Sequence, residues 1–273
     1  MNYVTTADNT KLYVKDWGSG KPVILLHGWP LSADSWDDQA MALADAGYRA
    51  ISYDRRGFGR SSQPWSGYDY DTLADDLAAV IEQTGARDAV LAGFSMGGGE
   101  VARYMSRHGG KNVRRAVLVS SVVPYMLKTE DNPHGTEPSV FEQMTNGMKE
   151  DRAKFFANFF KDFYGVSLVN SSASEEQVEA SCNTAMQASL KATLACAESF
   201  ATTDFRPDLS AFTVPTLIIH GVDDKTVPID ASSRAAAKGI KDATLIEYES
   251  APHGLLATHK SRITADLLDF IAR

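Results

Sequence analysis

The sequence predicts a domain of the α/β class, in which a mostly parallel β-sheet is flanked by helices. Two observations carry this prediction. Short runs rich in β-branched residues alternate with segments of helical periodicity, and crossover connections between parallel strands require this alternation. The chain has 273 residues, 44% of them hydrophobic, which is enough to bury one large core. The sequence contains no repeat or glycine-serine linker that would indicate a second independent domain.

Seven β-branched runs are predicted as strands, and most look fully buried, as is typical of strands covered on both faces. They are residues 12–17, 22–28, 49–54, 89–93, 114–121, 215–221 and 243–248. Helical periodicity occupies residues 35–47, 70–85, 96–109, 230–240 and the segment from Leu255 onward. Helix 70–85 has one apolar stripe and ends at Gly85, which suits a left-handed C-cap.

The interval 124–206 breaks the alternation because it contains no convincing strand. Within it, residues 139–165 and 174–201 have helical patterns. We therefore expect a helical insertion at 124–206 between two strands of one sheet, with residues 1–123 and 207–273 forming the core. Most of its Phe and Met side chains are expected to pack the insertion onto the core, and a minority to line a pocket.

Composition limits the classes of partner and the cellular compartment that can be expected for this protein. A formal net charge of -8 without long runs of one sign argues against a nucleic-acid surface. No stretch approaches the roughly 18 to 20 consecutive apolar residues that would span a bilayer, and the first residues lack a signal-peptide pattern. A continuous helix would separate Cys182 from Cys196 by about 21 Å, beyond disulfide reach, unless a break folds that segment back. We expect a cytoplasmic protein with reduced thiols.

The stretch LAGFSMGGG places Ser95 between a predicted strand and a predicted helix, with Gly93 and Gly97 on either side. A sharp turn from strand to helix strains the central residue, and side chains two positions before and after it would collide with each other. Such a turn lifts the hydroxyl above the strand end and exposes N–H groups at the helix N-terminus. Ser95 is therefore the candidate nucleophile.

A serine at its ordinary pKa is a poor nucleophile and needs a base. His253 follows the last predicted strand, at the sheet edge where Ser95 also lies, and is the candidate base. His27 and His220 each precede a glycine at a strand end and are expected to be structural. The remaining histidines are expected to be solvated: His108, His134 and His259.

The orienting acid is expected after strand 215–221, because the chain order Ser, Asp, His is typical of a hydrolase on such a sheet. The residues alone do not choose between Asp223 and Asp224. For a developing oxyanion, the natural donors are the N–H groups of Met96 and Trp29. Nucleotide and metal sites are disfavoured, because the segment DRRGFGRS lacks a phosphate-loop pattern and no His, Cys, Asp or Glu cluster has metal-ligand spacing.

The segments HGWPLSADSW, DRRGFGRSSQPW, GFSMGGGEVARY, DFRPDL, HGVDDKTVP and APHG together resemble the α/β-hydrolase superfamily along the whole chain. Most closely, the chain is similar to the cofactor-free bacterial haloperoxidases, also called perhydrolases, and to the related aryl esterases. The resemblance implies an α/β-hydrolase fold with an eight-stranded, mostly parallel sheet, and it makes the insertion a helical cap. It implies no haem, metal or vanadate cofactor, and a homo-oligomer that is a trimer or a dimer of trimers.

The resemblance also assigns roles. Ser95 is implied as the nucleophile, His253 as the base, and Asp224 as the acid because the family pattern places the carboxylate three residues before the valine of the Val-Pro pair. The N–H groups of Trp29 and Met96 are implied to form the oxyanion hole. The implied substrate-pocket residues are Pro30, Phe94, Met126, Met144, Phe159 and Val227.

The implied reaction is acyl transfer from a small aryl or alkyl ester through an acyl-enzyme on Ser95, with water or hydrogen peroxide as the acceptor. Released peracid would then oxidise halide outside the site. The proline at position 30 resembles that of subgroup members with efficient peracid chemistry. Proline removes one N–H and restrains Trp29, so the Trp29 carbonyl can turn toward the acyl-enzyme and accept a hydrogen bond from attacking peroxide.

Two alternatives remain open at this point. Relatives with the same motifs open lactams, so a lactamase or amidase acting on small cyclic amides is the enzymatic alternative. Some proteins of this fold keep the triad and serve as ligand receptors. A dehalogenase or epoxide hydrolase is disfavoured because those enzymes carry aspartate where this chain has Ser95.

Overall fold

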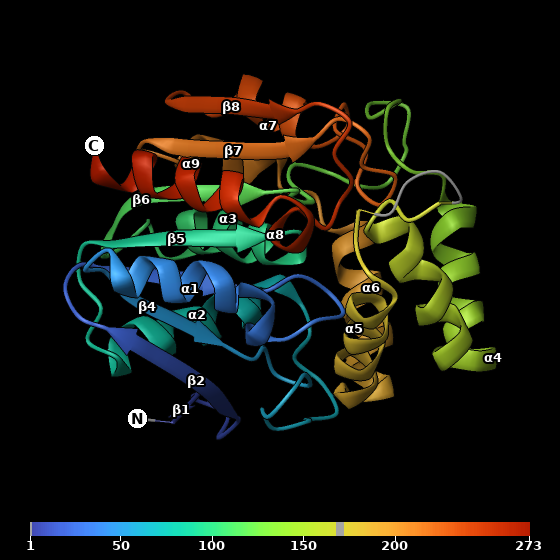
Figure 1. Ribbon diagram of the computed structural model, residues 1–273, viewed down its shortest axis with the longest axis horizontal. Helices are drawn as coiled ribbons and strands as arrows, with labels where there is room; N and C mark the ends of the chain where they lie inside the picture. The colour runs from blue at the N-terminus through green and yellow to red at the C-terminus, as the bar shows by residue number, and fades with distance from the viewer. Residues whose placement is uncertain (1, 168–171) are drawn as a thin grey trace.

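The centre of the molecule is a β-sheet with the strand order β1-β2-β4-β3-β5-β6-β7-β8 (Figure 1). The computed structural model describes residues 2–167 and 172–273. Within these residues the strands are β1 (Tyr3–Thr5), β2 (Lys11–Gly18), β3 (Pro22–Leu26), β4 (Arg49–Tyr53), β5 (Ala89–Phe94), β6 (Val113–Val119), β7 (Thr216–Gly221) and β8 (Ala243–Tyr248). Only the β1–β2 and β2–β4 pairs are antiparallel. The predicted fold class and all seven predicted strands are confirmed.

Strand β1 is the one strand that the sequence pattern did not predict. It has three residues, of which only Val4 is buried, and it pairs with β2 alone at the edge of the sheet. Such a short edge strand has no apolar run from which to recognise it. Strands β3, β5 and β7, by contrast, are buried at every residue, and they form the centre of the core.

Helices cover both faces of the sheet (Figure 1). Helices α1 (Asp37–Asp45) and α9 (Lys260–Ala272) contact each other on one face, while α2 (Tyr70–Gln83) and α3 (Met96–Arg107) pack together on the other, where α7 (Ser233–Gly239) also lies. The backbone at Gly85 has φ +66°, which confirms the expected left-handed cap after α2. At the start of α2, Asp69 caps the helix by accepting a hydrogen bond from the Thr72 N–H.

Three helices lie between β6 and β7 in the chain: α4 (Pro138–Phe163), α5 (Glu175–Gln187) and α6 (Leu190–Thr202). They stand beyond the edge of the sheet toward which the parallel strands run (Figure 1). The short elements η1 (Ala33–Trp36), α8 (Leu255–Thr258) and η2 (Arg206–Ala211) complete the chain. Part of the linker predicted at 166–173 falls on residues 168–171, outside the described residues.

The expectation of one continuous helix through both cysteines is wrong. The helical stretch 174–201 breaks after Gln187, and the Ser189 hydroxyl caps α6 by accepting a hydrogen bond from the Ala192 N–H. Ser189 prefers this capping role because its side chain competes for backbone donors. Cys182 and Cys196 therefore lie on different helices, and both are free thiols. A similar interruption occurs in α4, where Asp151 has φ -152°. Its side chain accepts a hydrogen bond from the Lys154 N–H and so caps the second part of the helix.

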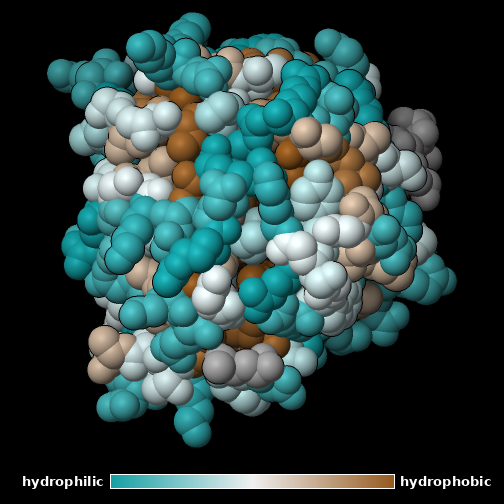
Figure 2. Space-filling view, turned by 90° about the vertical axis from the view of Figure 1, so that its left-hand side faces the viewer, coloured by the Kyte–Doolittle hydropathy of each residue, from teal (hydrophilic) through white to brown (hydrophobic). Residues whose placement is uncertain are grey.

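The two ends of the sheet differ in character. The face toward the amino ends of the parallel strands carries mostly hydrophilic side chains, with apolar residues in small separate areas (Figure 2). At the opposite edge, β3 lies between β4 and β5, so the connections leave it toward both sides of the sheet. Such a switch point at the carboxyl ends of parallel strands forms a crevice.

Among the described residues, no helix combines the length and the apolar character that crossing a bilayer requires.

Candidate active site

Ser95 occupies the sharp turn between β5 and α3, with φ 54° and ψ -117°. A Cβ atom on Gly93 would lie 2.4 Å from the carbonyl oxygen of Gly97, as the expected crowding across the bend requires. A Cβ atom on Gly97 would instead lie 2.5 Å from the carbonyl oxygen of Leu26, at the end of β3. The second glycine is therefore required by the packing of α3 against β3, which the local sequence does not reveal.

The structure brings Ser95, His253 and Asp224 together at this edge of the sheet. The Ser95 Oγ lies 3.0 Å from Nε2 of His253, and Nδ1 of His253 lies 2.6 Å from Oδ2 of Asp224. Ser95 and Asp224 are each 6% exposed, and His253 is fully buried. Asp223 is exposed, and its backbone N–H donates to the carbonyl of Ala251. Of the two aspartates that the spacing of residues left open, Asp224, which the family resemblance implied, is the one that reaches the histidine.

Asp224 is held ionised in spite of its burial. Burial alone raises the pKa of this carboxyl, but attraction to His253 and hydrogen bonds from His220 and His253 outweigh it and hold the pKa well below its usual range. Because the Asp224 carboxylate only accepts hydrogen bonds, Nδ1 of His253 carries a proton and donates a hydrogen bond to Asp224. The other ring nitrogen, Nε2, is then free to accept the Ser95 hydroxyl proton.

Two phenylalanine rings enclose the His253 imidazole. The ring centroids of Phe94 and Phe163 lie 5.3 Å and 4.8 Å from that of His253. Phe163 ends α4, and its carbonyl accepts a hydrogen bond from the Gly254 N–H, which ties α4 to the loop that carries His253. Phe163 was not predicted as a site residue, although the phenylalanine-rich segment that contains it was the available signal.

The predicted oxyanion donors lie at the start of α3 and after β3. In the described part of the chain, neither the N–H of Trp29 nor that of Met96 has a hydrogen-bond acceptor. The indole of Trp29 is fixed, because its Nε1–H donates to the carbonyl of Thr193 in α6 at 3.0 Å. Both N–H groups are therefore available to a ligand.

A buried ion pair braces the loop that carries Trp29. The Arg55 guanidinium donates to the His27 carbonyl at 2.6 Å and to the Glu100 carboxylate of α3 at 2.5 Å, and both charged side chains are 1% exposed. His27 also accepts a hydrogen bond from the Arg55 N–H at 2.9 Å. His27 thus has the structural role that the sequence analysis expected.

An apolar cavity of about 340 Å³ opens above Ser95. Trp29 and four of the six predicted pocket residues line it: Met126, Met144, Phe159 and Val227. The remaining lining residues were not predicted, and most come from α4 and the loop after Asp224: Val122, Thr136, Val140, Phe141, Phe155, Asn158, Asp162, Phe200, Lys225 and Thr226. The helices between β6 and β7 thus supply much of the cavity wall.

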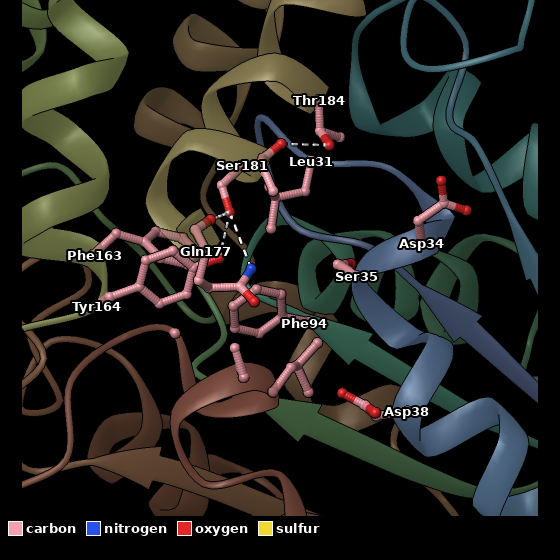
Figure 3. A pocket seen from close by; sticks show the side chains of 14 residues that line it. Leu31, Asp34, Ser35, Asp38, Phe94, Phe163, Tyr164, Gln177, Ser181 and Thr184 are labelled. Carbon is pink, nitrogen blue, oxygen red and sulfur yellow. Dashed lines mark hydrogen bonds between the residues drawn. The ribbon is translucent and has the colours of Figure 1, made fainter. Parts of the chain in front are cut away.

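Phe94 and Pro30 are not among the residues that line this cavity. Phe94 lines a second cavity of about 230 Å³, between η1, the start of α1 and α5. Figure 3 shows the rings of Phe94, Phe163 and Tyr164 on one side of it, with the Asp34 and Asp38 carboxylates on another. Pro30 is buried beside Trp29.

The remaining histidines differ in their surroundings. His220 is fully buried. His108 contacts Asp75 at 2.8 Å, His259 is partly buried beside Tyr248, and His134 is exposed. No group of His, Cys, Asp and Glu side chains within residues 2–167 and 172–273 is arranged to hold a metal ion.

Comparisons with known proteins agree with this geometry. Residues 21–260 match the family described as the alpha/beta hydrolase fold. The non-heme chloroperoxidase CPO-A1 of Kitasatospora aureofaciens is 41% identical over 273 residues, and the bifunctional esterase/perhydrolase DCH of Acinetobacter calcoaceticus is 42% identical over 274, with 99% of each chain covered in both cases. The crystal structure of bromoperoxidase from Bacillus anthracis superposes with a TM-score of 0.96 at 43% identity, covering 99% of both chains. The chain belongs to the α/β-hydrolase fold family and, within it, to the group of non-heme haloperoxidases and esterase/perhydrolases.

Proposed function

We propose that this protein is a serine hydrolase that cleaves small carboxylic esters through an acyl-enzyme and passes the acyl group to water or hydrogen peroxide. The hydrogen-bonded series Ser95–His253–Asp224 at the floor of an apolar cavity carries the proposal. The names of the esterase/perhydrolase and haloperoxidase relatives support it.

The chemistry follows from the positions of the groups. His253 takes the Ser95 proton as the serine oxygen attacks the ester carbonyl, and Asp224 stabilises the imidazolium that forms. The N–H groups of Trp29 and Met96 stabilise the oxyanion of the tetrahedral intermediate. His253 then protonates the departing alcohol, which leaves an acyl group on Ser95.

The acyl-enzyme is resolved by a second attack at the same carbonyl. His253 removes a proton from water or hydrogen peroxide, and the tetrahedral intermediate expels the Ser95 oxygen, which takes that proton from His253 and regenerates the free enzyme. Water yields a carboxylic acid, and hydrogen peroxide yields a peracid. The released peracid oxidises a halide ion to hypohalous acid in solution, which would account for a haloperoxidase activity carried by residues of the chain alone.

Segment 124–206 is proposed to act as a cap that selects the acyl group. Its helices supply Met144 and Phe159 to the cavity wall, and the apolar lining favours short acyl chains over charged substrates. We also propose that the protein works in the cytoplasm, where its free thiols stay reduced.

A homo-oligomer, either a trimer or a dimer of trimers, is proposed from the resemblance. The exposed indole of Trp65 supports self-association: Trp65 is 79% exposed, and the Lys191 ammonium lies 5.1 Å from its ring centroid. Sedimentation equilibrium of the wild-type chain and of Trp65→Ser measures the oligomeric state and its dependence on Trp65.

The decisive experiment follows p-nitrophenol release from p-nitrophenyl acetate with enzyme in the micromolar range. A burst stoichiometric with the enzyme, followed by steady turnover, is expected of an acyl-enzyme, whereas a ligand receptor binds without turnover. Adding hydrogen peroxide and monochlorodimedone with bromide measures peracid formation. A small lactam tested in parallel identifies an amidase, and absence of ester turnover contradicts the proposal.

A further inference from the structure

A second histidine, outside the candidate triad, lies against the carboxylate of Asp224. Oδ1 of Asp224 accepts two backbone hydrogen bonds, from the N–H groups of Thr226 and Val227, both at 2.8 Å. Oδ2 faces Nδ1 of His253 at 2.6 Å and, on another side, Nε2 of His220 at 3.1 Å. A side chain outside the triad therefore contacts the same carboxylate oxygen that orients the base.

The surroundings of His220 determine which of its nitrogens carries hydrogen. Nε2 faces two oxygens that only accept, Oδ2 of Asp224 at 3.1 Å and the carbonyl of Val227 at 2.9 Å. Nδ1 lies 2.6 Å from the Ser233 hydroxyl, which can donate. The neutral ring that suits these contacts carries its proton on Nε2, where it donates to the Val227 carbonyl with Oδ2 of Asp224 beside it, and accepts from Ser233 at Nδ1.

We propose that His220 is a positioning residue for Asp224, which through its Nε2–H keeps the carboxylate oxygen Oδ2 directed at His253. This inference rests on the proposed function, because it assigns His220 a role in activating Ser95. His220 does not touch the substrate cavity, and the route of its action is the series Ser233, His220, Asp224, His253, Ser95.

Asp224 needs a donor such as the Nε2–H of His220 because its carboxylate is buried. A carboxylate removed from water must replace several hydrogen bonds, and one that lacks donors rotates toward the remaining ones or takes up a proton. Without His220, both backbone donors would act on Oδ1, and His253 alone would hold Oδ2. The same Nε2–H also contacts the carbonyl of Val227, whose side chain lines the cavity, so it ties the acid to the cavity wall.

The alternative is that His220 only fills space at the end of β7. Two substitutions separate the possibilities. His220→Leu has a comparable size and no donor, whereas His220→Gln can place an amide N–H near the position of Nε2. We expect kcat for p-nitrophenyl acetate to fall about 10- to 100-fold in His220→Leu, the range of a hydrogen bond to a charged group, with KM unchanged and with most of the loss recovered in His220→Gln.

A matched control is available on the same strand. Ile218 is as fully buried in β7 as His220, and its apolar side chain has no hydrogen-bond donor to offer Asp224. Ile218→Ala is expected to lower the midpoint of thermal unfolding while leaving kcat close to that of the wild-type protein. Equal losses of kcat in Ile218→Ala and His220→Leu would overturn the proposal, because they would reflect loss of stability rather than loss of the donor.

The decisive measurement repeats His220→Leu in an Asp224→Ala background. If His220 acts through Asp224, the second substitution removes nothing further, and the two losses are not additive. A loss of the same factor in both backgrounds would overturn the proposal. A Ser95→Ala preparation gives the background rate, and the rates of Asp224→Ala and of the double variant must exceed it.

A spectroscopic readout keeps this inference separate from the proposed function. The proton between Nδ1 of His253 and Asp224 gives a low-field ¹H resonance, which we expect to shift in His220→Leu and to stay in place in Ile218→Ala. An unshifted resonance in His220→Leu would overturn the inference even if ester hydrolysis is established. A shifted resonance in a protein without ester turnover would contradict the proposed function and leave the contact between His220 and Asp224 intact.

Discussion

The Ser95 hydroxyl lies 3.0 Å from Nε2 of His253, although 158 positions separate the two residues in the chain. The serine is held by the turn after β5 and the histidine by the loop after β8. A second anchor keeps that loop in place, because the Ser120 hydroxyl donates to the His253 carbonyl at 3.2 Å. Nucleophile and base thus meet only because several parallel strands end at one edge of the sheet.

Replacing Ser95 by alanine is expected to abolish ester hydrolysis. Without the nucleophile no acyl-enzyme forms, and losses on the order of 10⁴-fold or more are typical of such substitutions. Ser35→Ala is the matched control, because Ser35 lines only the second cavity. Steady-state kinetics with p-nitrophenyl acetate check both variants. Retention of activity in Ser95→Ala would remove the basis of the proposed mechanism.

Gly97→Ala is expected to lower both stability and kcat. The added methyl group would lie 2.5 Å from the Leu26 carbonyl oxygen and 3.0 Å from that of His27, so α3 must move away from the end of β3. That movement displaces the Met96 N–H relative to the Trp29 N–H. Gly85→Ala is the control, because a Cβ atom there meets nothing within 4 Å and costs only the left-handed backbone strain of about 1 kcal/mol. Thermal unfolding and kcat distinguish the two.

Met126→Ala is expected to shift the enzyme toward longer acyl chains. Met126 is 2% exposed and lines the cavity with Ser95, so its removal creates space for additional methylene groups. The ratio of kcat/KM for p-nitrophenyl hexanoate to that for the acetate should rise by about tenfold or more. Met126→Phe should move the ratio in the opposite direction. An unchanged ratio in both variants would mean that acyl chains do not occupy this part of the cavity.

Pro30→Leu tests the choice between water and hydrogen peroxide. Leucine restores a backbone N–H and frees the φ angle at position 30, so the Trp29 carbonyl loses its restraint. We expect the ratio of peracid formation to ester hydrolysis to fall, while the burst that measures acyl-enzyme formation is kept. A constant ratio would show that this proline has no part in selecting the acceptor.

The two thiols should differ in reactivity. Burial raises the pKa of Cys196 to about 12, so almost no thiolate exists at pH 8, and Cys182 is only partly buried. Titration of the native protein with a chromogenic disulfide reagent should therefore detect no more than the Cys182 thiol. Both cysteines should react after unfolding in guanidinium, and a missing thiol in the unfolded protein would indicate a disulfide.

Much of the fold was predictable because its signals are local. Apolar runs of five to eight residues mark each buried strand, and glycines before and after Ser95 mark the turn that carries it. The break between α5 and α6 was missed because Ser189 sits in a stretch with continuous helical periodicity, where its role as a cap depends on which backbone groups it reaches. Phe94 was expected in the substrate cavity and instead lines the second one, since the ring direction depends on packing against Gly28.

The sequence by itself determined the fold class, the position of the candidate nucleophile and the sheet edge where a base had to lie, because periodicity and turn chemistry act over a few neighbouring residues. The family resemblance favoured Asp224 over Asp223. Only the tertiary structure decided that the Asp224 carboxylate reaches His253, that Phe163 covers His253, and that His220 contacts the acid. These are contacts between elements far apart in the chain. These contacts depend on where the sheet places the strand ends, and the spacing of residues along the sequence does not reveal how close those ends lie in space.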